Sequence, residues 1–268
     1  MAEDMDGAGP IGLLGAGRMG GALIEGWTRA GAIDPRTLII IEPHPSDAVQ
    51  ALGARLNPPA SELAEIRTLI LAVKPQVWRA AAADVASGLA PDAVIVSIAA
   101  GVPLAHISEA FGGRRVARVM PTTAVAIGKG VASIYAPDSE AHARAHALFA
   151  PVATTVDLIH ESLMHAATAV SGSAPAYLYA FIEALEAAGA KAGLSEKASR
   201  RLARATIAGA SALLEASGEE PAELRRQVTS PGGTTQAAVE VLMGKDGLGP
   251  LLEKAVAAAF HRSQDLAG

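Results

Sequence analysis

The fold of this chain is decided by the stretch Ile11-Gly12-Leu13-Leu14-Gly15-Ala16-Gly17-Arg18-Met19-Gly20-Gly21-Ala22-Leu23. A short apolar run, predicted to be a β-strand, leads directly into three glycines with the spacing Gly-x-Gly-x-x-Gly, and a helical pattern follows. Gly15 permits a tight turn, Gly17 lets the backbone approach a pyrophosphate, and Gly20 allows close packing of helix on strand. The helix N-terminus offers free N–H groups to phosphates. We predict a dinucleotide site formed by Gly15, Ala16, Gly17, Arg18, Met19 and Gly20.

The rest of the first 160 residues alternates short β-branched runs with helical stretches. Strands are predicted at Ile11–Leu14, Leu38–Ile41, Thr68–Val73, Ala93–Ile98, Arg115–Met120, Gly130–Tyr135 and Thr154–Leu158. Helices are predicted between the earlier strands, at Gly20–Ala30, Asp47–Leu52, Val77–Gly88 and Leu104–Phe111. Strands that alternate with crossover helices indicate a parallel sheet covered on both faces. We therefore predict an α/β, doubly wound domain of the Rossmann type over residues 1–160.

After about His160 the strand pattern stops and alanine-rich helical windows replace it. These windows are Ser162–Val170, Pro175–Ala192, Ser195–Ser217, Pro221–Thr229, Thr234–Met243 and Gly249–Leu266. Several are apolar on all sides, which requires burial on all sides, and roughly a hundred residues cannot bury that much surface alone. Residues 161–268 are therefore predicted to be an all-helical domain that forms much of a subunit interface.

Composition limits the class of protein. The chain has 268 residues, a formal net charge of −5 and no cysteine. An acidic balance without clustered Lys and Arg argues against nucleic-acid binding. The absence of cysteine suits a reducing compartment, and the start, Met1-Ala2-Glu3-Asp4-Met5-Asp6, is acidic where a signal peptide would be basic. The uncharged stretch 163–182 is interrupted by Ser171, Gly172, Ser173 and Pro175, so we expect a cytoplasmic protein without a membrane span.

Further cofactor contacts are predicted at strand ends, because ligands of open α/β sheets bind beyond the carboxyl ends of the strands. Glu42 closes the second strand, where a carboxylate binds the ribose hydroxyls of NADH and repels the 2′-phosphate of NADPH; alternatively, it merely faces water. Arg18 and His44 would soften that repulsion, so the sequence leaves NADH or NADPH open. Two later loops complete the predicted set, with the residues Ala72, Val73, Lys74, Pro75, Ala99, Ala100 and Gly101.

Two loops in the helical half are candidates for binding a small anion. Ser171-Gly172-Ser173-Ala174-Pro175 and Ser230-Pro231-Gly232-Gly233-Thr234-Thr235 each precede a predicted helix. Both would present free backbone N–H groups and hydroxyls without a charged side chain, which suits a carboxylate. The alternative is ordinary capping of the helix.

These two loops, read with the glycine motif, resemble the signature segments of the pyrroline-5-carboxylate reductases. The resemblance extends to Ala72-Val73-Lys74-Pro75, Ala100-Gly101 and Arg118-Val119-Met120-Pro121, and it runs from Gly12 to about Leu266. It implies NAD(P)H-dependent reduction of 1-pyrroline-5-carboxylate to L-proline, and a helical domain that interlocks with a partner's in a homodimer, with dimers often assembled into a decamer. It also implies an active site between the cofactor loop and the helical domain.

The resemblance assigns the substrate residues. It places the Thr235 hydroxyl near the ring nitrogen of the substrate, as the catalytic residue, and it gives the substrate carboxylate to Ser230, Gly233 and Thr234; Ser171 and Ser173 complete the predicted substrate set. The chain departs from the family pattern at Thr122, Ala124, Ala174 and Arg18, where asparagine, proline, glycine and asparagine are usual. Thr122 in particular puts a contact to the nicotinamide in doubt.

No motif supplies an obvious catalytic acid. An imine protonates readily, so the protein need mainly orient the reactants in a dry pocket. The rival functions are another imine reductase, a β-hydroxyacid dehydrogenase, and a non-catalytic dinucleotide-binding sensor. A hydroxyacid dehydrogenase commonly needs a lysine base, and His165 to Tyr179 contains none. His142 and His146 lie four apart on a predicted helix and would make half of a metal site, but no third ligand falls at ligand spacing, so no metal is expected.

Overall fold

The computed structural model describes residues 5–266, and the acidic residues at positions 3 and 4 lie outside the described range. The chain divides into two compact units. One unit extends to Gly172 and takes up the chain again from Phe260, and the other comprises Ser173–Ala259. The domain boundary that the sequence analysis places near residue 160 stays a prediction. Within the described residues, the last strand is β8, which ends at Asp157.

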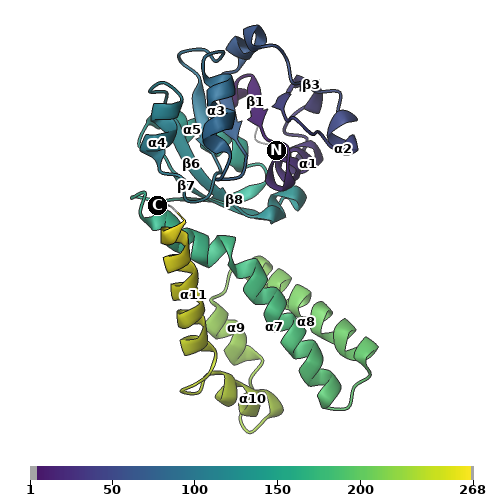
Figure 1. The fold of residues 1–268 in the computed structure, drawn as a ribbon. Helices are drawn as coiled ribbons and strands as arrows, with labels where there is room; N and C mark the ends of the chain where they lie inside the picture. Colours follow the sequence, from purple (N-terminus) through teal and green to yellow (C-terminus); the bar gives the residue numbers. More distant parts are fainter. Residues whose placement is uncertain (1–4, 267–268) are drawn as a thin grey trace. The chain divides into compact units, whose positions relative to one another are not determined.

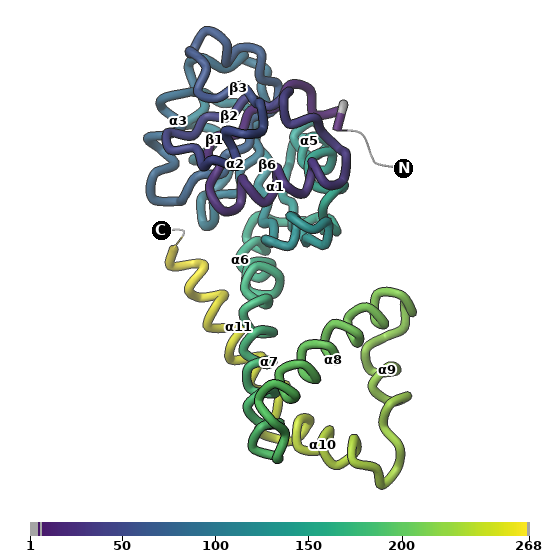
Figure 2. The backbone as a smooth tube through the Cα atoms, turned by 90° about the vertical axis from the view of Figure 1, so that its right-hand side faces the viewer, coloured from purple at the N-terminus to yellow at the C-terminus, as the bar shows by residue number. Residues whose placement is uncertain are grey.

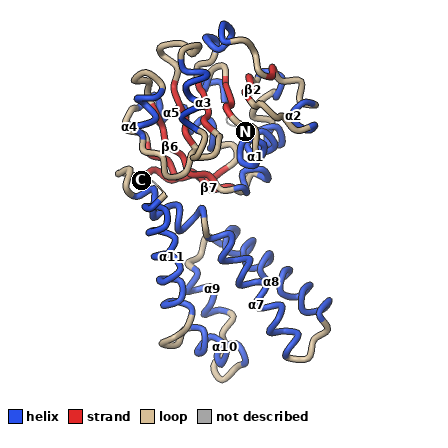
Figure 3. Tube along the Cα trace, viewed as in Figure 1, coloured by secondary structure: helices blue, strands red, loops and turns tan. Residues whose placement is uncertain are grey.

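The first unit is built on one eight-stranded sheet of order β3-β2-β1-β4-β5-β6-β7-β8 (Figures 1 and 3). Its strands are β1 (Ile11–Leu14), β2 (Ile39–Ile41), β3 (Arg55–Leu56), β4 (Thr68–Leu71), β5 (Val94–Ser97), β6 (Val116–Pro121), β7 (Gly130–Tyr135) and β8 (Ala153–Asp157). Strands β1 to β3 are added in sequence order toward one edge of the sheet. Strands β4 to β8 are then added in sequence order on the other side of β1. The strand order therefore reverses at β1, and the predicted doubly wound fold is confirmed.

One strand departs from the predicted parallel sheet. β7 runs antiparallel to β6, with Arg118 opposite Tyr135 and Pro121 opposite Ala132. Only the 3₁₀ segment η4 (Thr123–Ile127) lies between them, and a parallel pair would need a longer crossover connection. β8 returns to a parallel pairing with β7, because the helix α5 (Ser139–Phe149) connects the two strands.

Helices cover both faces of this sheet, as predicted. One apolar core contains Leu23, Ile24 and Trp27 of α1 (Arg18–Ala30) together with buried residues of α5. The other contains residues of α3 (Trp78–Ala86) and α4 (Leu104–Ala110). The Trp27 indole N–H donates to the Leu148 carbonyl at 2.7 Å, so α1 and α5 are joined by a buried hydrogen bond as well as by apolar contact.

The remaining short segments of this unit are α2 (Asp47–Gln50), α6 (Leu163–Ala167) and the 3₁₀ helices η1 (Met5–Ala8), η2 (Pro35–Thr37) and η3 (Ala60–Glu65). The segment after β8 is fixed by Glu161, whose Oε1 accepts from buried Arg118 at 2.6 Å and from the Leu104 N–H at 2.7 Å. His165 Nδ1 lies 3.0 Å from Ser263 Oγ, so this ring has a hydrogen-bond partner within the same unit.

The second unit consists of helices alone (Figure 2). They are α7 (Ala174–Lys191), α8 (Glu196–Ser217), α9 (Pro221–Gln227), α10 (Thr234–Leu242) and α11 (Leu248–Asp265), and α11 ends in the first unit. α7 and α8 form a hairpin in which the Ser199 hydroxyl donates to the Glu186 carbonyl at 2.6 Å. The predicted helical windows are confirmed to within about two residues at most ends, apart from the first, which continues beyond α6 into a π-helical turn.

The second unit lacks a core of its own. Among the described residues of α7, α9, α10 and α11, no side chain is buried, and α8 buries only Ser199 and Ala203. Large apolar side chains lie exposed instead, among them Tyr179, Leu202, Leu213, Val241 and Leu251. Apolar surface of this extent is the mark of a surface that another chain covers.

Across residues 5–266, no helix combines the length and the apolar character needed to span a bilayer.

Candidate cofactor and substrate site

The glycine loop between β1 and α1 has the conformation that the motif predicts. Gly15 has φ +99°, in the region that favours glycine, and a Cβ there would lie 2.9 Å from the Ala72 carbonyl oxygen. A Cβ on Gly20 would lie 2.3 Å from the Gly15 carbonyl oxygen. Gly17 differs, because a Cβ there would meet nothing within 4 Å. Two glycines thus permit close packing of the backbone, and the third leaves open space above the loop.

The N-terminus of α1 opens directly onto this space. Gly17 is the residue that precedes the helix, and it makes no side-chain capping bond. Of the first helical N–H groups, Gly21 is the first to find a helical partner, at 2.8 Å from the Gly17 carbonyl. The N–H groups before it carry the partial positive charge of a helix start. The loop therefore fits a pyrophosphate group.

A cavity of about 670 Å³ lies at the carboxyl ends of the central strands. Most of the predicted cofactor residues line it: Gly15, Gly17, Arg18, Met19, Glu42, Ala72, Val73, Lys74, Pro75 and Ala100. The order of the sheet explains the gathering, because β1, β2, β4 and β5 are parallel neighbours whose carboxyl ends meet at one edge. Segments far apart in sequence thus form one wall.

Four predicted cofactor residues do not line this cavity. Ala16 lines a second cavity of about 950 Å³ that lies between α1 and α2 and shares Gly17, Arg18 and Glu42 with the first. Gly20 is buried beneath the loop, and Ala99 is buried in the core next to α3 and α4. Gly101 is half-buried beyond the end of β5 and has φ +75°, so it serves the turn.

The structure adds lining residues that the sequence analysis missed. Val77, Ala80, Ala81 and Asp84 come from the region of α3 that follows Lys74-Pro75. Their spacing could have predicted that they face the cavity together, since residues three and four apart lie on the same face of a helix.

Glu42 is held rigidly at the mouth of both cavities. Its Oε2 accepts from the Ala16 N–H at 3.0 Å, and its Oε1 accepts from the His44 N–H at 3.0 Å. Asn57 fixes the backbone of the same residue: Asn57 Oδ1 accepts from the Glu42 N–H, and Asn57 Nδ2 donates to the Glu42 carbonyl, each at 2.9 Å. Glu42 therefore does not merely face water, which was the alternative interpretation of this residue.

Asn57 was not predicted to have any role. It has φ +46°, and no other described residue except glycine has a positive φ. Asn tolerates this conformation better than most residues, and the two hydrogen bonds to Glu42 stabilise it here. The Asn57-Pro58-Pro59 sequence is typical of a turn, but the pairing of that turn with Glu42 depends on β2 and β3 lying side by side.

Thr122 follows β6 and is buried. Its hydroxyl accepts from the Val131 N–H at 3.0 Å, and its own N–H donates to the Val131 carbonyl at 2.9 Å. The departure from the usual asparagine therefore places a hydroxyl in the β6–β7 connection.

The predicted Ser171 loop is not a loop. Residues Thr168–Gly172 form a π-helical turn that continues α6 toward α7, and the Ser171 hydroxyl donates to the Ala167 carbonyl at 2.8 Å. The expectation of free backbone N–H groups there was wrong, because a helical turn uses those groups internally. Ser173 lies directly before α7 and makes no side-chain capping bond.

The second predicted loop has the expected form. Ser230 and Gly233 close a turn in which the Gly233 N–H donates to the Ser230 carbonyl at 3.0 Å, and Gly232 has φ +68°. α10 then begins at Thr234, and its N-terminus carries no side-chain cap. Thr234 and Thr235 thus occupy the first turn of a helix whose leading N–H groups include free donors.

Two family models match parts of this chain. The family model "Pyrroline-5-carboxylate reductase dimerisation" matches residues 161–266, and "NADP oxidoreductase coenzyme F420-dependent" matches residues 10–101. A pyrroline-5-carboxylate reductase of Synechocystis is 38% identical over 96% of this chain and 97% of its own length. One of Pseudomonas aeruginosa is 37% identical over 96% of both chains.

Solved structures give the same result for the fold. The structure of a pyrroline-5-carboxylate reductase from Coxiella burnetii has a TM-score of 0.89 and 26% identity, covering 97% of this chain and 99% of that chain. That of Plasmodium falciparum pyrroline carboxylate reductase, with NADP bound, has a TM-score of 0.83 and 27% identity, covering 97% and 98%. On sequence and structure alike, this chain belongs to the pyrroline-5-carboxylate reductase family.

Proposed function

We propose that this protein reduces 1-pyrroline-5-carboxylate to L-proline with a reduced nicotinamide dinucleotide, in the cytoplasm. The observation that carries the proposal is the similarity over nearly the whole chain to pyrroline-5-carboxylate reductases, at up to 38% identity for the relatives compared above. It covers the glycine loop and the Ser230–Thr235 turn together. The absence of cysteine suits a reducing compartment.

The cofactor is held by the residues around the strand-end cavity. The pyrophosphate binds over Gly17 at the start of α1, where open space and free N–H groups coincide. Ala72, Val73, Lys74 and Pro75 form the far wall, together with Ala100. Glu42 accepts hydrogen bonds from the adenosine ribose, a role supported by its fixed position beside Ala16. When bound, the reduced nicotinamide supplies the hydride that the imine carbon accepts.

NADH and NADPH differ in the group at the 2′-position of the adenosine ribose, which is the group proposed to lie next to Glu42. A fixed carboxylate favours the free 2′-hydroxyl of NADH and repels a 2′-phosphate. Arg18 lines the same cavities and His44 lines one of them, so a cation stands near the same place. We propose that Glu42 dominates, because two hydrogen bonds fix its carboxylate beside the loop, whereas the Arg18 side chain is exposed.

The substrate carboxylate binds at the start of α10. Ser230, Gly233 and Thr234 surround free N–H groups of a helix N-terminus, which attract an anion without requiring a charged side chain. Ser171 and Ser173 complete the proposed set. The Ser171 hydroxyl donates to the substrate carboxylate only by giving up its bond to the Ala167 carbonyl.

Thr235 orients the ring nitrogen of the substrate. Its hydroxyl belongs to the first turn of α10, next to the proposed carboxylate site, which suits a ring bearing both groups on adjacent atoms. Reduction adds a hydride to the imine carbon and leaves a proton on the nitrogen. Because the imine protonates readily in water, we assign Thr235 the orientation of the protonated nitrogen and not the supply of its proton.

The protein acts as a homodimer, with five dimers associating into a decamer. The dimerisation family model over residues 161–266 and the coreless helical unit both support the dimer. Light scattering of the purified protein should give a mass of at least two chains across micromolar concentrations. A mass of ten chains would support the decamer, and a mass of two chains would contradict it. The mass of one chain would contradict the proposed interface.

The reaction itself is tested by following cofactor oxidation at constant 1-pyrroline-5-carboxylate, with NADH and NADPH in parallel. We expect turnover that depends on both substrates and yields proline. Tight cofactor binding without turnover would overturn the proposal in favour of a dinucleotide-binding sensor. Turnover with other cyclic imines alone would reassign the substrate.

A further inference from the structure

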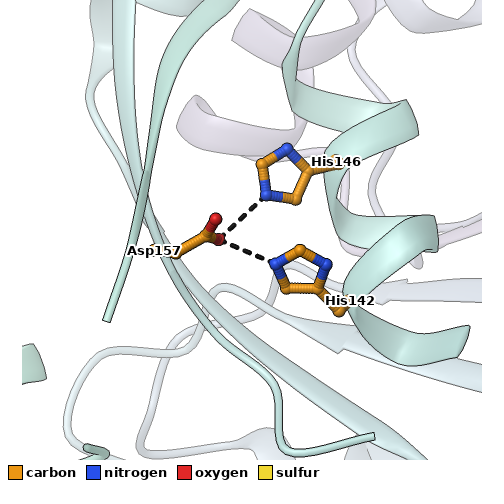
Figure 4. Close-up of side chains that lie close together, drawn as sticks. All are labelled: His142, His146 and Asp157. Carbon is orange, nitrogen blue, oxygen red and sulfur yellow. Dashed lines mark hydrogen bonds and ion pairs between the residues drawn. The ribbon is translucent and has the colours of Figure 1, made fainter. Parts of the chain in front are cut away.

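A second cluster of chemically active side chains lies away from the strand-end cavity. His142 and His146 project from the same side of α5, and Asp157, the last residue of β8, faces both of them (Figure 4). The Nε2 atoms of both histidines lie 2.9 Å from the same atom, Oδ1 of Asp157. The two imidazole rings are 4.5 Å apart between centroids. Three ligand atoms therefore converge within 4.8 Å of one another.

The scaffold under this cluster is rigid. The opposite face of α5 buries Ala141, Ala145, Leu148 and Phe149, so the rotation of the helix is fixed by the core. Its N-terminus is capped by Asp138, which accepts from the Glu140 and Ala141 N–H groups. Asp157 is paired with Ile134 of β7 in the sheet. The three side chains are thus presented by two elements whose backbones are fixed before any ligand arrives.

From this geometry we infer a binding site for a divalent transition-metal ion, of which Zn²⁺ is the natural probe, with His142, His146 and Asp157 as its ligands. Two imidazoles and one carboxylate suit Zn²⁺, Co²⁺ and Ni²⁺, whereas Mg²⁺ and Ca²⁺ prefer all-oxygen sites. Ligand atoms of a tetrahedral zinc ion lie roughly 3.3 Å apart, given bonds of about 2.0–2.1 Å. The two observed N···O separations of 2.9 Å need to open by a few tenths of an ångström, and all three ligand atoms lie within 4.8 Å of one another.

Access and charge also suit a metal ion. The three side chains are 41%, 30% and 54% exposed, for His142, His146 and Asp157 respectively, so an ion enters from solvent and keeps water at its remaining position. An aspartate carboxylate is ordinarily ionised near neutral pH, as a metal ligand must be.

Binding would join α5 to the carboxyl end of β8, a strand at the edge of the sheet. This site shares no residue with the strand-end cavity or with the α10 turn, so it stands independently of the proposed reductase function. An ion bound only to the folded chain raises its stability.

The test is calorimetric titration of ZnCl₂ into the full-length, untagged oligomer, with the thermal unfolding midpoint as a second readout. We expect one Zn²⁺ per chain and a raised midpoint. His146→Ala and Asp157→Asn should each weaken Zn²⁺ binding by more than about 100-fold. Removing a residue that only hydrogen-bonds to a metal ligand costs about 10- to 100-fold in affinity, and removing the ligand itself costs more. His106→Ala is the control, because this exposed histidine of α4 belongs to the same unit but not to the cluster.

Circular dichroism of each variant checks that the fold is retained, and His142→Ala provides a third variant if one of the others fails to fold. Zn²⁺ binding that persists unchanged in the folded cluster variants, or no binding by the wild-type protein, would overturn the inference. Visible absorption of the Co²⁺-loaded protein offers an independent check, since it reports whether the bound ion has the low coordination number that three protein ligands and a water imply.

Discussion

Replacing Glu42 by glutamine should raise the ratio of kcat/KM for NADPH to that for NADH by roughly 30- to 100-fold. A 2′-phosphate carries a charge of about −1.5 to −2, and two unit charges about 4 Å apart interact by roughly 1 kcal/mol in water and 4 kcal/mol near a protein surface. Removing the carboxylate charge is therefore worth about 2–3 kcal/mol to NADPH, at 1.4 kcal/mol for each factor of ten.

Glutamine is the informative replacement because it keeps an oxygen for the Ala16 N–H while it removes the charge. The kcat/KM for NADH should fall by less than about 10-fold, since a neutral amide still forms hydrogen bonds with the ribose hydroxyls. Glu109→Gln, on the exposed surface of α4, is the matched control and should leave the ratio unchanged. Steady-state kinetics with both cofactors measure the effect; an unchanged ratio in Glu42→Gln would mean that the 2′-position binds away from this carboxylate.

Replacing Thr235 by valine should lower kcat/KM for 1-pyrroline-5-carboxylate by roughly 10- to 100-fold. Valine has nearly the same shape as threonine but lacks the hydroxyl, so the change removes one hydrogen bond to a charged ring nitrogen, worth about 1.5–3 kcal/mol. The dissociation constant of the cofactor should stay the same, because the proposed cofactor residues all lie on the first unit, while Thr235 belongs to α10.

Thr235→Ser is the control, since serine keeps the hydroxyl and should restore most of the activity. Fluorescence titration of the cofactor and steady-state kinetics of the imine separate the two effects. If Thr235→Val kept full kcat and KM, the orienting role of Thr235 would be excluded, while the reductase activity itself would stand.

Local patterns in the sequence predicted much of what was found. The glycine spacing after β1 predicted the tight loop that the structure contains. Gly15 and Gly20 are needed there because no larger side chain fits their backbone positions. The helices of the second unit were predicted nearly residue by residue, since helical periodicity depends on neighbours within one turn. The exposure of that unit was predictable too, because helices apolar on all sides need a second chain.

Local patterns failed where a segment had two acceptable states. The Ser171–Pro175 stretch combines small polar residues with a proline, which is typical of a loop, yet Thr168–Gly172 continues the helix as a π-turn. β7 reads like the other strands, and only the short connection through η4 sets its antiparallel direction.

The sequence by itself determined the dinucleotide loop, the Rossmann-type sheet and the helical second half, because each rests on local patterns of residues. It determined the family through several such local motifs spread along the chain. Only the tertiary structure decided which distant residues meet. It paired Asn57 with Glu42 and brought Asp157 to His142 and His146, as strand pairing and the packing of α5 require. Side-chain spacing along one helix or strand is fixed by backbone geometry, whereas contact between elements depends on how the whole core packs.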